Sequence, residues 1–194
     1  MKCVVVFFSL LVGIKSCGDF YWRDYTGNIP IDAVEGGPYY STSGEITRSY
    51  IGQGYVHGFG LMIGRITAGN PYINVACYGV KTVTENIKIL CAQDKSKYYW
   101  VSTTSATYAK DTLNKCPVLG GYDYTLLETA NLTDGDGKLV VGRSSADPNN
   151  NNIGDIAAYS SQPLFYYAPL NSDDDQVTTT NFQVLMYSDY PILL

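Results

Sequence analysis

The sequence has few of the residues on which most enzymes and nucleic-acid-binding proteins depend. It contains one histidine, and its 13 Lys and Arg residues face 18 Asp and Glu residues, for a formal net charge of -5. An acidic chain without basic clusters is a poor candidate for binding nucleic acid or an anionic membrane surface. A catalytic His paired with Ser or Cys would have to be His57, which lies between Gly-rich turns and beside no nucleophile motif. We therefore expect no enzyme activity and no cofactor.

Long apolar runs are also scarce, and the one that exists lies at the start of the chain. Residues 3–13 are apolar apart from Ser9, follow Lys2, and precede small residues at positions 16–18. This pattern predicts a secretory signal peptide over residues 1–17. The run is too short for a permanent membrane span, so the sequence predicts a secreted protein. Cleavage after Cys17 would remove Lys2 and Lys15 and make the mature chain more acidic.

Cysteines are few, and their positions suggest how they are used. Cys77 and Cys91 are placed as two residues facing each other across a hairpin, which predicts a disulfide between them. Cys116 is then either a small buried residue or the partner of a retained Cys17. Asn131 begins a glycosylation sequon, which in a secreted chain indicates an exposed turn.

Helix-forming patterns are absent from the sequence, and strand and turn residues are abundant. The chain has 18 Tyr and 19 Gly, and no stretch shows sustained helical periodicity. Residues 21–25 and 46–55 are predicted as strands, and residues 72–78 and 86–91 as the two arms of a hairpin. These features predict an all-β fold.

A duplication organises the chain. Gly52 and Gly64 recur as Gly142 and Gly154, with the same interval between the two glycines of each pair. We interpret the chain as two repeats, the second degenerate, that share one core. They are expected over residues 21–95 and 98–190.

The landmarks of the first repeat follow one another in a characteristic order. They are Trp22, Gly-x-Ile-Pro-x-x-Ala-Val-x-x-Gly at 27–37, Tyr-Ile-Gly at 50–52, Gly-Leu-x-x-Gly-Arg-Ile at 60–66 and Ile-x-Ile-Leu at 87–90. This order resembles the DM-nine repeat of invertebrate secreted and cytosolic proteins, which also occurs in natterin-like toxins. The second repeat retains fewer landmarks, with Trp100 answering Trp22.

The resemblance implies a fold, a function and a site. The fold is two pseudosymmetric antiparallel β-sheet repeats with exchanged strands, and the function is that of a non-enzymatic, lectin-like recognition protein of innate immunity, usually binding mannose. The family's pocket uses a Lys and an Asp. This chain has Arg65 and Tyr39 at those positions in the first repeat, and Asp155 and Asp123 in the second. A mixed carbohydrate-binding site of Arg65 and Asp123 is the candidate, provided that strand exchange brings the halves together.

Other interpretations stay open. In one, Arg65 pairs with a surface carboxylate and Asp123 lies in a turn, and neither binds a ligand. In another, the protein is a secreted structural or effector protein that binds another protein through a Tyr-rich surface. A homodimer is left open. The acidic runs at 134–136 and 173–175 lack the spacing of an EF-hand loop, so no metal site is expected.

Overall fold

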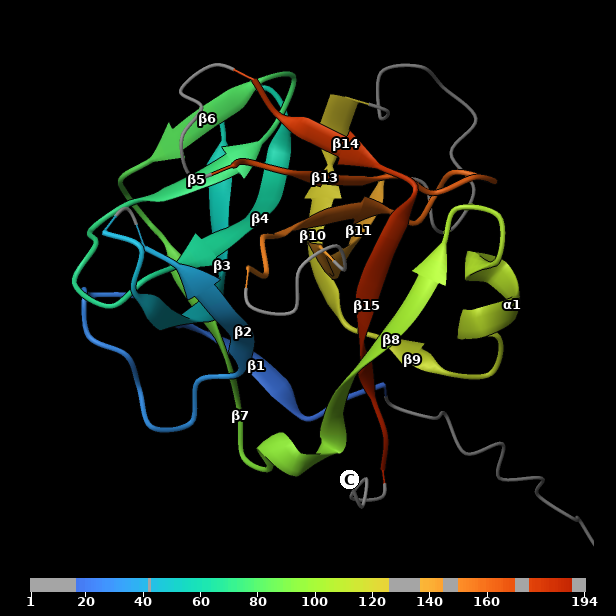
Figure 1. The fold of residues 1–194 in the computed structure, drawn as a ribbon, viewed down its shortest axis with the longest axis horizontal. Coiled ribbons are helices and arrows are strands. Elements are labelled where there is room, and N and C mark those ends of the chain that lie inside the picture. Colours follow the sequence, from blue (N-terminus) through green and yellow to red (C-terminus); the bar gives the residue numbers. More distant parts are fainter. Residues whose placement is uncertain (1–16, 42, 126–136, 145–149, 170–174, 190–194) are drawn as a thin grey trace, which may run out of the picture.

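The computed structural model describes residues 17–41, 43–125, 137–144, 150–169 and 175–189. This part of the chain contains fifteen antiparallel strands, which confirms the all-β prediction (Figure 1). The strands of the first half are β1 (Phe20–Asp24), β2 (Glu35–Tyr40), β3 (Ile46–Val56), β4 (Gly60–Ile66), β5 (Ile73–Ala76), β6 (Val80–Val83) and β7 (Lys88–Ala92). Those of the second half are β8 (Tyr98–Thr104), β9 (Cys116–Pro117), β10 (Leu119–Asp123), β11 (Lys138–Ser144), β12 (Ile153–Ala157), β13 (Phe165–Tyr167), β14 (Val177–Thr179) and β15 (Asn181–Tyr187). The helical elements are η1 (Lys95–Lys97) and α1 (Tyr108–Thr112).

The two halves carry the same pattern of strand pairing. In the first, β3 pairs with β2, β4 and β7, β1 pairs with β7, and β5 joins β4 to β6. In the second, β11 pairs with β10, β12 and β15, β8 pairs with β15, and β13 joins β12 to β14. The register agrees as well, because Trp22 lies opposite Leu90 and Trp100 opposite Leu185. Strand β9 has a counterpart in the first half, because Ala33 bridges Cys91 there as Pro117 pairs with Met186 in the second. Helix α1 lies in the connection between β8 and β9, and the described residues between β1 and β2 of the first half contain no helix.

Contacts between the halves are reciprocal. The exchange of strands expected from the sequence is limited, among the described residues, to one pairing between β4 and β10. Side chains strengthen this contact in both directions. Gln53 donates from Nε2 to the carbonyl of Gly120 at 2.5 Å, and Arg143 donates from Nη1 to the carbonyl of Gly36 at 3.1 Å. Figure 1 shows the first-half strands on one side and the second-half strands on the other, with β13 and β14 reaching across toward β5.

The hairpin predicted between residues 72–78 and 86–91 does not form. Strand β5 turns back into β6, whereas β7 pairs with β1 and β3. Cys91 therefore lies opposite Tyr21 of β1, and Cys77 lies at the tip of the β5–β6 hairpin. The predicted Cys77–Cys91 disulfide is wrong: both are buried free thiols, and the disulfide joins Cys17 to Cys116.

The core is shared by both halves. Its main cluster includes Ile51 and Ile63 of the first half and Leu185 of the second, all almost fully buried. Trp22 and Trp100 are partly buried and pack against this cluster. None of the described helices is long and apolar enough to span a bilayer.

Candidate functional site

Arg65 and Asp155 occupy equivalent places in the two halves. Each follows a glycine of the duplicated pattern, Gly64 on β4 and Gly154 on β12, and each extends toward the other half. Asp155 accepts a hydrogen bond at Oδ1 from the backbone N–H of Ile63 on β4, at 2.8 Å. The same position of the repeated fold is therefore a cationic residue in the first half and an acidic residue in the second.

Arg65 lines a cavity of about 340 Å³, which we call the Arg65 cavity. Its guanidinium lies 4.5 Å from the centroid of the Tyr39 ring and donates from Nη1 to Oδ1 of Asn152 at 3.1 Å. The hydroxyl of Tyr39 donates in turn to Oγ1 of Thr67 at 3.1 Å. The polar and aromatic groups that line this cavity include Tyr39, Ser41, Thr67, Asn70, Tyr72 and Asn74.

The charge of Arg65 has no acidic partner in the part of the chain that the structure describes. The four ion pairs there involve other residues. Burial lowers the pKa of Arg65, yet a guanidinium remains protonated in proteins. Arg65 therefore keeps N–H groups and a positive charge for a ligand in the cavity.

Asp155 lines a second cavity, of about 130 Å³, which we call the Asp155 cavity. Asp155 is 3% exposed, and its Oδ2 has no hydrogen-bond partner among the described residues. Burial, together with the charge of Asp123, raises the pKa of Asp155 well above its usual value. The other lining residues that bear on its chemistry are Cys77, Tyr78, Asp123, Tyr159, Tyr166 and Gln176.

Asp123 closes one side of the Asp155 cavity. Its Oδ1 accepts hydrogen bonds from the N–H and the hydroxyl of Thr125, at 2.9 and 2.6 Å. Its Oδ2 accepts a long bond from the hydroxyl of Tyr159, at 3.4 Å. Burial, followed by the charge of Asp155, raises the pKa of the Cys77 thiol to about 12, so Cys77 is protonated and a poor nucleophile near neutral pH.

The structure separates the two residues of the predicted carbohydrate site. Arg65 lies with Tyr39 in one cavity and Asp123 with Asp155 in the other, and the two cavities share no lining residue. The mixed site of Arg65 and Asp123 does not form, because each residue meets the second site position of its own half. The predicted sequon at Asn131 lies outside the described residues.

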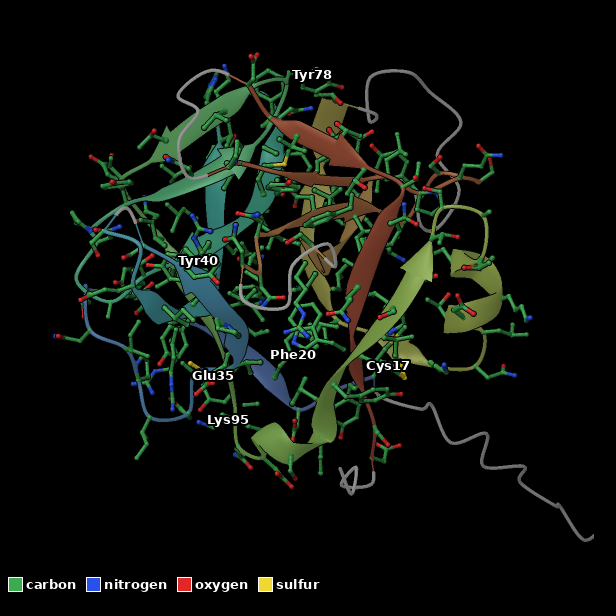
Figure 2. All side chains as sticks on the ribbon, viewed as in Figure 1. Cys17, Phe20, Glu35, Tyr40, Tyr78 and Lys95 are labelled. Carbon is green, nitrogen blue, oxygen red and sulfur yellow. A yellow bond between two sulfur atoms is a disulfide. The ribbon has the colours of Figure 1, made fainter. Side chains whose placement is uncertain are left out.

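Sequence reasoning missed the tyrosines of the Asp155 cavity. Tyr78 lies on the turn of the β5–β6 hairpin at the upper edge of the molecule (Figure 2). Its φ of 49° lies in the left-handed region, which bulky residues rarely adopt. Gly79, the next residue, is a turn signal in the sequence, but it also fits the loop of the longer hairpin predicted between residues 72–78 and 86–91. Tyr159 and Tyr166 carried no signal, because nothing in the sequence distinguishes them from the other tyrosines.

Comparisons with known proteins give a likeness of fold. No family model matches the chain, and no curated protein matches it. Among solved structures, it is similar to the crystal structure of the nematode sperm cell motility protein MFP2B, with a TM-score of 0.56 and 13% identity. The alignment covers 90% of this chain and 47% of that one, so this chain spans about half the length of MFP2B. At this identity the likeness shows a shared fold and nothing about ligands.

Proposed function

We propose that this chain is a secreted, non-enzymatic carbohydrate-binding protein of two DM-nine-like repeats, and that its sugar occupies the Arg65 cavity. The observation that supports this most is a partly buried guanidinium with no acidic partner among the described residues, in a cavity edged by hydroxyl and amide groups. A buried charge is retained in a folded protein when something pairs with it. A bound ligand would supply that pairing.

The lining of the Arg65 cavity suits a sugar. Planar groups such as a guanidinium or a side-chain amide bind two neighbouring oxygens at once. Arg65, Asn70 and Asn74 provide such groups within one cavity. Tyr72, which is 41% exposed, offers an aromatic face against which the apolar side of a sugar ring packs.

The unpaired charge also favours one class of sugar. A guanidinium forms its strongest hydrogen bonds with carboxylate and phosphate-like oxygens, because both partners carry charge. We therefore expect Arg65 to prefer glycans that carry a carboxylate or a sulfate. Mannose, which the resemblance implies, is the neutral comparison.

Secretion is part of the same proposal. A disulfide between Cys17 and Cys116 is typical of an oxidising compartment. Cleavage after Cys17 would remove one half of this disulfide. We therefore place the signal cleavage site before Cys17, which keeps the basic and apolar start of the chain as the signal peptide.

A glycan array that carries both acidic and high-mannose glycans tests the proposal. The wild-type mature protein is expected to bind acidic glycans selectively. Arg65→Gln removes the charge and is expected to weaken this binding at least about tenfold, as for loss of a charge-assisted hydrogen bond. Asn70→Ala changes an exposed residue at the cavity and is expected to weaken binding without lowering the melting temperature.

Arg48→Gln is the matched control for that array. Arg48 is an exposed arginine that pairs with Glu35 at 2.9 Å, outside the Arg65 cavity. It should bind glycans as the wild type does. A folded wild-type protein that binds no glycan, or an Arg65→Gln variant that binds as well as Arg48→Gln, would refute the proposed site.

A protein-binding effector is the second candidate function. It is favoured by the exposed aromatic surface, since six of the ten exposed large hydrophobic residues in the described part of the chain are tyrosines. Tyrosine provides large contact area with a polar tip, which suits protein interfaces. A blank glycan array from a folded protein would favour this function.

A further inference from the structure

The Asp155 cavity has acidic groups without a cation to balance them. Asp123 and Asp155 both line it, and neither takes part in the four ion pairs found among the described residues. Both side chains are buried, at 7% and 3% exposure. Two buried carboxyl groups that face one cavity repel each other when both are ionised, so ionisation of both is favoured only when a cation lies beside them.

The Oδ2 atom of Asp155 points to a missing hydrogen-bond donor. It is buried, lines the cavity through its carboxyl group, and has no partner in the described part of the chain. The other oxygen of the same group is satisfied by Ile63. Buried polar atoms in native proteins are nearly always paired, and leaving one unpaired costs free energy. A ligand with an N–H or O–H group would satisfy it.

Aromatic rings surround the same space. Tyr159 and Tyr166 line the cavity from the second half, and Tyr78 lines it from the β5–β6 hairpin of the first. The hairpin is held there because the N–H of Gly79 donates to Oε1 of Gln176 at 3.1 Å. The faces of aromatic rings attract cations. Carboxyl groups and three aromatic rings together therefore favour a positively charged organic group.

We propose that the Asp155 cavity binds the primary ammonium group of a small amine. Such a group carries three N–H donors, which match the free Oδ2 of Asp155 and the weakly bonded Oδ2 of Asp123. A quaternary ammonium has no donor and would leave Asp155 unsatisfied. The described residues contain no group of three His, Cys, Asp or Glu side chains arranged to hold a metal ion, and the cavity volume of about 130 Å³ suits a small organic head group.

This site is independent of the proposed sugar site. The two cavities share no lining residue, and the equivalent positions Arg65 and Asp155 carry opposite charge. Each cavity is thus expected to take a ligand of the opposite sign. Failure of glycan binding at the Arg65 cavity would leave the amine site untouched.

Titration calorimetry of the folded wild-type protein tests the proposal, with n-butylamine as the ligand and 1-butanol as its neutral analogue. Butylammonium is expected to bind and butanol is not. Tetramethylammonium is expected to bind more weakly than butylammonium, because it offers no N–H group. Glucosamine, compared with butylamine, distinguishes the source: tighter glucosamine binding assigns the ammonium to an amino sugar, and tighter butylamine binding assigns it to an alkylamine.

The decisive variant is Asp155→Asn, which removes the charge and keeps an oxygen for the N–H of Ile63. It is expected to weaken butylamine binding at least about tenfold, as for the loss of a hydrogen bond to a charged group. Glu45→Gln, on an exposed acid away from the cavity, should bind as the wild type does. Asp123→Asn provides a second test that does not depend on the folding of Asp155→Asn. Equal binding of butanol and butylamine, no butylamine binding by the wild type, or full binding by either cavity variant would overturn the proposal.

Discussion

Arg65 and Asp155 stand at the same place in two copies of one structural pattern, and their surroundings decide what each can do. Arg65 is stacked on Tyr39 and bonded to Asn152, so its position is fixed while part of its guanidinium stays available. Among the described residues, Asp155 is held by a single backbone N–H, and its Oδ2 has no partner. A guanidinium cannot lose its charge to escape burial, whereas a carboxyl group can do so by binding a proton. The two residues therefore respond differently to pH.

Replacement of Asp155 with Asn should change the pH dependence of folding stability. The pKa of Asp155 is raised in the folded state above its unfolded value of 3.8. Between those two values the folded protein holds the proton more tightly, so the free energy of unfolding falls as pH rises through this range. Each unit by which the pKa is raised contributes about 1.4 kcal/mol to that fall. Asp155→Asn removes this contribution, so the variant should gain stability relative to the wild type as pH rises above about 4, as measured by urea unfolding at several pH values.

The control for this measurement is Glu45→Gln, which replaces an exposed acid outside the Asp155 cavity and is carried through the same pH series. The other titratable groups of the Asp155 cavity are Asp123, Cys77 and the three tyrosines Tyr78, Tyr159 and Tyr166. Burial raises the pKa values of Cys77 and Tyr159, so neither ionises in the range measured. Parallel stability curves for Asp155→Asn and the wild type would show that Asp155 is ionised throughout.

Strands β4 and β12 carry the site residues because glycines let neighbouring strands approach closely. A Cβ atom on Gly64 would lie 2.5 Å from the carbonyl oxygen of Asn74, and one on Gly154 would lie 2.0 Å from that of Tyr166. Both oxygens belong to backbone, which cannot move without shifting its strand. The glycine before each site residue is thus required by packing, and the same close approach brings Tyr166 to the Asp155 cavity.

Gly154→Ala is therefore expected to destabilise the protein strongly. The new methyl group meets the backbone of β13, and we expect a loss of about 3 kcal/mol in the free energy of unfolding, the upper range for overpacking. Gly44→Ala is the control, because a Cβ there meets no atom within 4 Å and its φ of +83° alone is unfavourable. That conformational effect should cost about 1 kcal/mol, because a residue with a Cβ is disfavoured in the left-handed region. A urea unfolding series in which Gly154→Ala loses no more than Gly44→Ala would contradict the packing argument.

How far the strands could be predicted depended on their length and pattern. Residues 46–55, most of β3, were predicted from their alternating pattern, and residues 21–25, which overlap β1, from their aromatic content, because both features are typical of strands. Strand β6 was missed because it is short and carries Lys81 and Thr82 among its four residues. Without β6, Cys77 and Cys91 were assigned to facing strands, and the wrong disulfide followed.

At the scale of the whole molecule, the duplicated glycines indicated two related halves, and the pairing pattern and the registers of Trp22 and Trp100 agree with this. The cavities could not be predicted in the same way. Each draws residues from both halves: Tyr78 joins Asp155 in one, and Ala168 joins Arg65 in the other. Such meetings depend on how the halves pack, which no local pattern records.

The disulfide links the two halves at a large sequence separation and is expected to stabilise their association. Cys17 precedes β1 of the first half, Cys116 lies in β9 of the second, and they are 99 residues apart in sequence. Closing so long a loop restricts the unfolded chain, so replacing both cysteines by serine should lower the free energy of unfolding by about 2–4 kcal/mol. Alkylation of the denatured, unreduced mature protein, followed by peptide mass mapping, should label Cys77 and Cys91 and leave Cys17 and Cys116 unlabelled until reduction. Label on Cys17 and Cys116 before reduction, with Cys77 and Cys91 protected, would instead restore the pairing predicted from the sequence.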